Sequence, residues 1–123
     1  MKPFLVTQGF TTKQGKSAAL IAWVRANEQR LRDTAPDGIE FVGIYGNVFP
    51  SEKNTGDTWF VVAMDNYAAM DTWAAMPGTP FGDLVDEFFG FIDPDKDAPG
   101  SHFLLKSAAV VTVWGDEDPE AGE

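Results

Sequence analysis

The stretch Thr58-Trp-Phe-Val-Val-Ala-Met64 decides the fold, because it carries apolar side chains at nearly every position. Its β-branched and aromatic residues, bounded by polar neighbours, predict a strand. Side chains alternate along a strand, so Phe60 and the even positions face one side of the sheet while Trp59 and the odd positions face the other. A sheet with one solvated face would carry polar residues at every second position. Both faces of this sheet are therefore expected to be covered.

Three further segments have strand character. The predicted strands span residues 4–10, 39–49 and 102–114. Gly43 and Gly46 weaken the second of them and predict a bulge or a close approach of backbones. With the central stretch, these segments give four strands separated by two helical regions.

Two regions of helical periodicity complete the pattern. The first is expected to begin with Ser17 as its N-cap and to stop before Pro36, because the residue that precedes a proline avoids the α region. The second is interrupted by Pro77-Gly78. Thr79 then provides a new N-cap, and Pro80 suits the first helical position. The predicted order is strand, helix, strand, strand, helix, strand.

This order predicts an α+β fold of the ferredoxin-like βαββαβ type. Two split strand-helix-strand units interlock into a four-stranded antiparallel sheet, and right-handed crossovers put the helices on one face. The length fits one domain, which we assign to residues 1–115. Residues 116–123 carry five acids and no base, and they predict a solvated, disordered tail.

The apolar character of both strand faces predicts self-association. Two helical regions cover only one face of a four-stranded sheet, and an exposed apolar face of several hundred Å² is a liability. The simplest cover is the same face of a second copy, which gives a homodimer packed sheet against sheet. The alternative is that the interrupted second helical region wraps further around the sheet.

A chain of this size, with βαββαβ order and strands apolar on both faces, resembles the dimeric α/β-barrel superfamily. That group includes antibiotic-biosynthesis-type monooxygenases and muconolactone isomerase-like proteins. The resemblance covers about residues 4–115 and rests on the pattern of elements rather than on a diagnostic motif. It implies a dimeric α/β barrel. The monooxygenases of this group use no metal or flavin, and polar and aromatic residues assist an electron-rich substrate.

Composition excludes several function classes. Nine Lys and Arg residues stand against 19 Asp and Glu, and the formal charge of −10 argues against nucleic acid and anionic membranes as partners. The absence of Cys removes thiolate chemistry and iron-sulfur clusters, and a single His argues against zinc. No metal or cofactor is therefore expected. No apolar run is long enough to span a membrane, and a cytoplasmic location is expected.

A few polar and aromatic side chains are candidates for chemistry. His102, the only His, could act as a general base, and the alternative is a strand-end His without function. Tyr45 and Asn47 lie two residues apart on one predicted strand and share a face. These three are the candidate catalytic residues. The candidate ligand-binding residues are Gln8, Trp59, Trp73 and Trp23. The alternative is that the aromatic rings are simply core.

The sequence therefore predicts a dimeric α/β-barrel protein that binds a small organic ligand between sheet and helices. Apolar walls with a few hydrogen-bonding groups are what such a pocket requires. The resemblance implies a cofactor-independent monooxygenase acting on an aromatic or polyketide-like compound. Two alternatives remain open: a non-catalytic binding or stress-response dimer, and an isomerase or lyase using His102.

Overall fold

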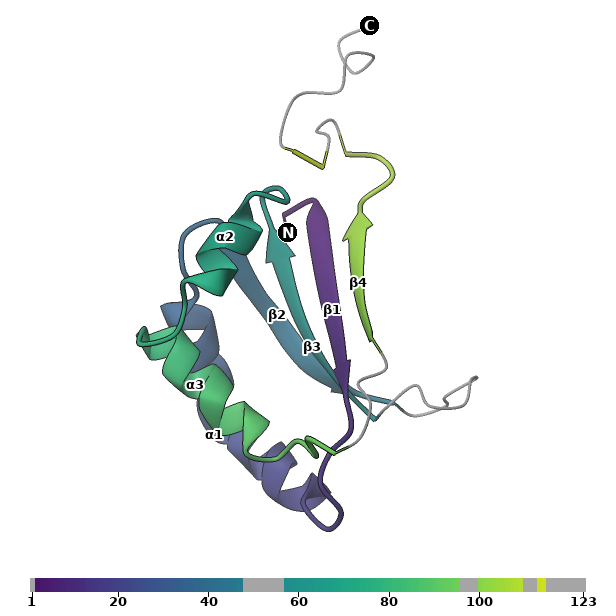
Figure 1. Ribbon diagram of the computed structural model, residues 1–123, viewed down its shortest axis with the longest axis vertical. Coiled ribbons are helices and arrows are strands. Elements are labelled where there is room, and N and C mark those ends of the chain that lie inside the picture. The colour runs from purple at the N-terminus through teal and green to yellow at the C-terminus, as the bar shows by residue number, and fades with distance from the viewer. Residues whose placement is uncertain (1, 48–56, 96–99, 110–112, 115–123) are drawn as a thin grey trace, which may run out of the picture.

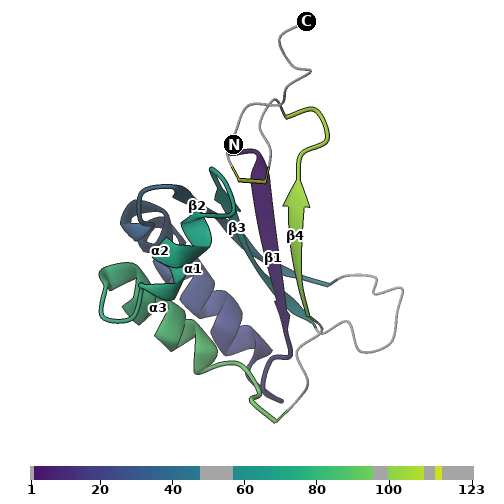
Figure 2. The same cartoon turned by 45° about the horizontal axis from the view of Figure 1, so that its top comes forward.

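The computed structural model describes residues 2–47, 57–95, 100–109 and 113–114 (Figure 1). The elements in chain order are β1 (Phe4–Phe10), α1 (Ser17–Thr34), β2 (Ile39–Gly46), β3 (Thr58–Met64), α2 (Ala69–Ala74), α3 (Pro80–Phe89) and β4 (Gly100–Leu105). The strands form one antiparallel sheet in the order β2-β3-β1-β4. All three helices lie on one face of this sheet (Figures 1 and 2). The predicted α+β, ferredoxin-like class is confirmed.

The core forms between the helices and one face of the two central strands. β1 and β3 have the predicted bounds, and Val6 of β1 pairs with Val62 of β3. Both side chains are buried. Phe60 and Met64, which share the face of Val62, are buried as well, and this face points toward the helices. Apolar burial of this kind is the main force that holds helices on a sheet. The largest fully buried side chains include Phe4, Phe60, Phe81, Phe88 and Leu31.

The expected bulge in the second strand is present. The register between β2 and β3 shifts between Phe41 and Gly43. The ring of Tyr45 lies over Gly43, since a Cβ added there would be 3.0 Å from the Tyr45 Cε2 atom. A side chain at this position would require the Tyr45 ring to shift.

Two predictions about helix ends are confirmed and one is wrong. α1 ends at Thr34, two residues before Pro36. Thr79 caps α3, because its Oγ1 accepts a hydrogen bond from the Gly82 backbone N–H at 3.1 Å. Ser17, however, is the first residue of α1 rather than its N-cap. Lys16 holds the cap position and makes no side-chain capping bond.

The last strand is shorter than expected. It ends at Leu105, which pairs with Phe4, the first residue of β1. The next residue, Lys106, donates its N–H to the carbonyl of Pro3, just before β1, and the chain then turns as the Ala109 N–H bonds to the Lys106 carbonyl. The second strand likewise ends at Gly46, opposite the first residue of β3. The predicted extensions over residues 48–49 and 110–112, and the predicted tail at 116–123, lie outside the described residues.

The opposite face of the sheet carries no helix among the described elements (Figure 2). We call it the open face. Its residues are the odd positions of β1 and β3 and the residues that pair with them, including Trp59, Tyr45 and Leu104. Tyr45 and Leu104 are each about half exposed, at 53% and 50%. None of the described helices is both long and apolar enough to cross a membrane.

Candidate functional site

The seven side chains predicted to form a site lie in separate parts of the fold. Two hollows flank the helical layer, and the remaining candidates lie on the open face or in the core. Gln8 and Trp73 line the first hollow, and Trp23 lies in the core. Tyr45 and Asn47 lie at the edge of the second hollow and belong, with Trp59 and His102, to the open face. The fold therefore joins Gln8 with Trp73 and separates both from His102.

The first hollow lies between the β1–β4 side of the sheet and the helices α2 and α3. We call it the Gln8–Trp73 hollow. Its volume is about 410 Å³. Its lining is mostly apolar and comes from Gln8, Gly9, Phe10, Trp73, Ala74, Met76, Pro77, Gly82, Val85, Asp86, Phe89 and Ser101. Ligand pockets typically combine apolar walls with a few polar groups.

Strand alternation explains why Gln8 points into this hollow. Gln8 lies between Val6 and Phe10 on the helix-facing side of β1, and it pairs with Ser101 of β4. Its side chain is half-buried. Among the described residues, neither the Gln8 amide nor the Ser101 hydroxyl makes a side-chain hydrogen bond. A half-buried amide of this kind can donate to and accept from a ligand.

The opposite wall depends on aromatic packing and on one glycine. Trp73 of α2 packs edge-on against Phe60 and Phe81, with ring centroids 6.0 and 6.2 Å away. At the start of α3, a Cβ on Gly82 would lie 2.1 Å from the Met76 carbonyl oxygen. Glycine at this position lets α3 approach the segment that follows α2. The two helices thereby form one continuous wall.

Charge around the Gln8–Trp73 hollow is sparse and acidic. Among the described side chains that line it, only the exposed Asp86 is ionisable. None of the described lining side chains is basic, and the whole chain carries a formal charge of −10. The local potential therefore disfavours anions.

Trp59 joins two other candidates on the open face. Its indole N–H donates to the Asn47 Oδ1 at 2.8 Å. Its ring lies 6.1 Å from the imidazole of His102, at an angle of 36°. Trp59 pairs with Gly9 of β1, which has no side chain to separate the two rings. His102 follows Ser101, so it points to the face opposite Gln8.

Trp23 belongs to the packing between α1 and the end of α3. Its ring lies 6.4 Å from Phe88 and 6.0 Å from Phe91. Its Nε1 is buried and has no hydrogen-bond partner among the described residues. The alternative interpretation from the sequence, that some Trp residues are core, fits this side chain.

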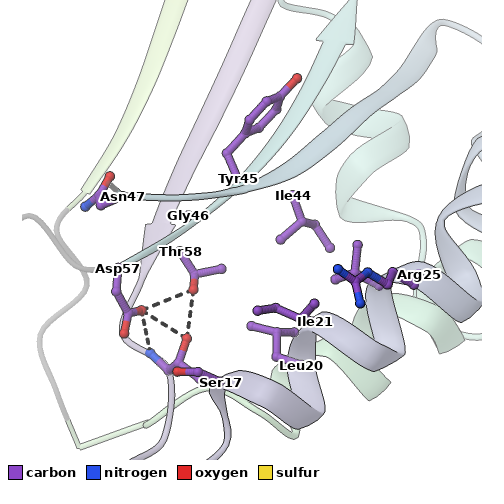
Figure 3. Close-up of a pocket in the computed structure, with 12 residues that line it drawn as sticks. Ser17, Leu20, Ile21, Arg25, Ile44, Tyr45, Gly46, Asn47, Asp57 and Thr58 are labelled. Atoms are coloured by element: carbon purple, nitrogen blue, oxygen red, sulfur yellow. Dashed lines mark hydrogen bonds between the residues drawn. The ribbon is translucent and has the colours of Figure 1, made fainter. Parts of the chain in front are cut away.

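The second hollow lies between α1 and the end of β2 (Figure 3). We call it the α1–β2 hollow. Its volume is about 400 Å³, and Tyr45 and Asn47 contribute to its lining. At one end, Asp57 accepts hydrogen bonds from Thr12, which is buried like its neighbour Thr58. Sequence reasoning missed this hollow because the strand-helix distance that creates it has no signature in the residue pattern.

Ser101 and Asp86 were also missed in the first hollow. Ser101 could have been found from the register of β4 against β1, which puts it beside Gln8. Asp86 follows the buried Val85 on α3 and precedes the exposed Phe89 by three residues, so it lies at the edge of the apolar stripe of that helix. Over the described ranges, no group of three or more His, Cys, Asp or Glu side chains is arranged to hold a metal ion.

Comparisons with known proteins support the fold. No family model matches the chain, and no curated protein matches it. A solved structure of a conserved protein from Methanosarcina mazei Go1 aligns with a TM-score of 0.51 at 12% identity, over 84% of this chain and 91% of that one. A protein provisionally described as an antibiotic biosynthesis monooxygenase, from Chloroflexus aurantiacus J-10-fl, aligns with a TM-score of 0.50 at 12% identity, over 86% and 94%.

The chain therefore shares its fold with these two solved structures. The resemblance predicted from the order of elements is therefore confirmed at the level of fold. The heme-degrader MhuD from Mycobacterium tuberculosis, solved with two hemes bound in its active site, aligns with a TM-score of 0.46 at 14% identity, over 89% of this chain and 100% of that one. Identities this low concern the fold, and function has to be argued from the site.

Proposed function

We propose that the chain binds a small, uncharged aromatic compound in the Gln8–Trp73 hollow. One observation carries the proposal: the half-buried Gln8 amide has no side-chain partner among the described residues and lines an apolar hollow of about 410 Å³. Trp73, Phe10 and Phe89 supply aromatic surface for a planar ring. Gln8 supplies a donor and an acceptor that fix its orientation.

The charge of the hollow supports an uncharged ligand. The carboxylate of Asp86 disfavours a second anion, and none of the described lining side chains is a base that compensates it. A phenol or a ketone avoids this repulsion and can hydrogen-bond to Gln8. A carboxylic acid of the same shape is expected to bind less well.

Beyond binding, we propose that the chain catalyses a cofactor-independent oxygenation of the bound compound. It is supported by the fold shared with the Chloroflexus protein and by the aromatic walls of the hollow. In this reaction an activated CH₂ group loses a proton, and the resulting carbanion reduces O₂. One oxygen atom becomes the new carbonyl and the other leaves as water. Gln8 would stabilise the substrate oxygen that gains charge, as preorganised donors do, and Asp86 would accept the proton.

Binding is tested by calorimetry with 2-naphthol as the probe. Gln8→Leu should weaken binding about five- to tenfold, the usual loss for one hydrogen bond. The matched control is Thr7→Val, which changes the neighbouring residue of β1 on the open face and should leave the affinity unchanged. Equal affinity in Gln8→Leu and the unmodified chain would refute the proposal.

Turnover is tested separately with anthrone, a neutral tricyclic ketone whose CH₂ group O₂ converts to a carbonyl. An oxygen electrode should record uptake faster than the spontaneous reaction, and Gln8→Leu should reduce it. If 2-naphthol binds in a Gln8-dependent manner but anthrone is oxidised at the spontaneous rate, the non-catalytic binding alternative is supported. The proposal gives His102 no role in this hollow, so His102→Ala should change neither result.

We also propose that the open face pairs with the same face of a second copy. The exposed side chains of Tyr45 and Leu104, and the half-buried Trp59, make this face apolar where solvent would favour polar residues. Sedimentation equilibrium should give about twice the 13.4 kDa chain mass. A single species at the monomer mass at all concentrations would contradict the homodimer.

A further inference from the structure

The α1–β2 hollow has the features of a second ligand site. Two small residues, Ser17 at the start of α1 and Gly46 at the end of β2, leave space between helix and strand. The floor is apolar and is formed by Leu20 and Ile44, with Ile21 at the rim. Ile21 is 52% exposed, so an apolar ligand body that covers it removes hydrophobic surface from water.

Arg25 gives this hollow a cation that its own helix does not neutralise. The residues one turn away, Ile21 and Gln29, are uncharged. Glu28, which could reach Arg25 along the helix, is paired with Arg32. Across the described residues, Arg25 makes no hydrogen bond or ion pair. Its guanidinium group is thus available for a ligand anion, and a carboxylate fits that group with two parallel hydrogen bonds.

The other end of the hollow carries the opposite charge. Figure 3 shows Arg25 and Asp57 at opposite ends, with Leu20, Ile21 and Ile44 between them. The Asp57 Oδ1 is already held by the Thr12 N–H at 2.9 Å. This fixed carboxylate repels an anion at its end of the hollow. A ligand is therefore favoured with one anionic group directed toward Arg25 and an apolar body over the floor.

We propose that the α1–β2 hollow binds a small monocarboxylate with an apolar body. The volume of about 400 Å³ accommodates a single ring with a short chain. Arg25 binds the carboxylate, Ile21 and Ile44 contact the body, and Asp57 disfavours dicarboxylates. This site is lined by α1, β2, Thr12 and the start of β3 with Asp57, whereas the Gln8–Trp73 hollow is lined by β1, β4, α2 and α3. The two charge preferences are therefore separate properties of the chain.

The test is an amide-resolved NMR titration of the full chain with 3-phenylpropionate. Shifts should concentrate at Ser17, Ile21, Arg25 and Gly46. Arg25→Gln should weaken binding about five- to tenfold, as expected for a lost charged hydrogen-bond pair. The matched control is Arg30→Gln, which makes the same charge change further along α1 at a residue outside the lining of the hollow and should alter the affinity less than about twofold.

Two further measurements define the ligand class. The uncharged amide, 3-phenylpropionamide, should bind at least about fivefold more weakly than the acid. Ile21→Ser, a change at an exposed position that leaves the fold intact, should also weaken binding of the acid. The proposal is overturned if Arg25→Gln binds the acid as well as the unmodified chain does, if the amide binds equally well, or if the shifts map to Gln8 and Trp73 instead.

Discussion

Replacing Asp57 with alanine should destabilise the fold more than its exposed position suggests. Its Oδ1 lies 2.9 Å from the Thr12 backbone N, 3.0 Å from the Thr12 hydroxyl and 3.1 Å from the Thr58 hydroxyl. The two hydroxyl oxygens are 2.7 Å apart. Thr12 and Thr58 are both buried, at 7% and 5% exposure. This cluster joins the segment that follows β1 to the first residue of β3.

The expected loss of unfolding free energy follows from the number of hydrogen bonds that Asp57 accepts. Each hydroxyl has one hydrogen, so only one of the two can donate to Asp57 while the other donates to its neighbouring hydroxyl. Asp57 therefore accepts two bonds, one from the Thr12 N–H and one from a hydroxyl. At about 1–1.5 kcal/mol each, their loss costs about 2–3 kcal/mol. Asp57→Asn keeps an acceptor oxygen in place and should cost about 1 kcal/mol.

The assay is urea unfolding followed by circular dichroism at one fixed protein concentration. The matched control is Asp65→Ala, at the other end of β3, where the carboxylate makes a 2.7 Å surface ion pair with Lys2. Such a pair contributes at most about 1 kcal/mol. Equal losses of unfolding free energy in Asp57→Ala and Asp65→Ala, or no loss in either, would refute the reasoning.

Three further predictions concern the helical wall and the open face. Gly82→Ala should lower the unfolding free energy by about 1–3 kcal/mol, because its Cβ would lie 2.1 Å from the Met76 carbonyl oxygen, and an unchanged urea midpoint would contradict this. Thr79→Ala should cost about 1 kcal/mol in the same assay through loss of the α3 cap, whereas Thr79→Ser should retain most of the stability. Leu104→Asp should shift the sedimentation mass from dimer to monomer, and the matched change Ile21→Asp, at an equally exposed position on α1, should leave the mass unchanged.

Local patterns predicted the parts of the fold that local chemistry controls. β3 has the expected bounds because it is an apolar run between polar breaks, and β1 has them because β-favouring residues are followed by the polar segment 11–15. Thr79 and Pro80 predicted the start of α3, because a capping hydroxyl and a proline at the first helical position are also local features. The end of β4 could not be read in this way. Apolar residues resume after Lys106 and Ser107, but β1 begins at Phe4, the partner of Leu105, so the pairing ends there.

The candidate sites were predicted less completely, because which side chains meet depends on how neighbouring strands are aligned with each other. Alternation along β1 correctly put Gln8 on the side of Phe10, and Trp73 lines the same hollow. Residue type alone could not separate these two from His102 and Asn47. That separation follows from the pairing of Gln8 with Ser101, which turns His102 to the opposite face. The α1–β2 hollow arises from helix-strand spacing, which no local pattern encodes.

The most direct test of the proposed function is a crystal structure of the full chain soaked with 2-naphthol. The account predicts the bicyclic ring in the Gln8–Trp73 hollow, against Trp73 and Phe89, with its hydroxyl bonded to the Gln8 amide. A ring bound elsewhere, or an empty hollow at a concentration that saturates binding in solution, would contradict it.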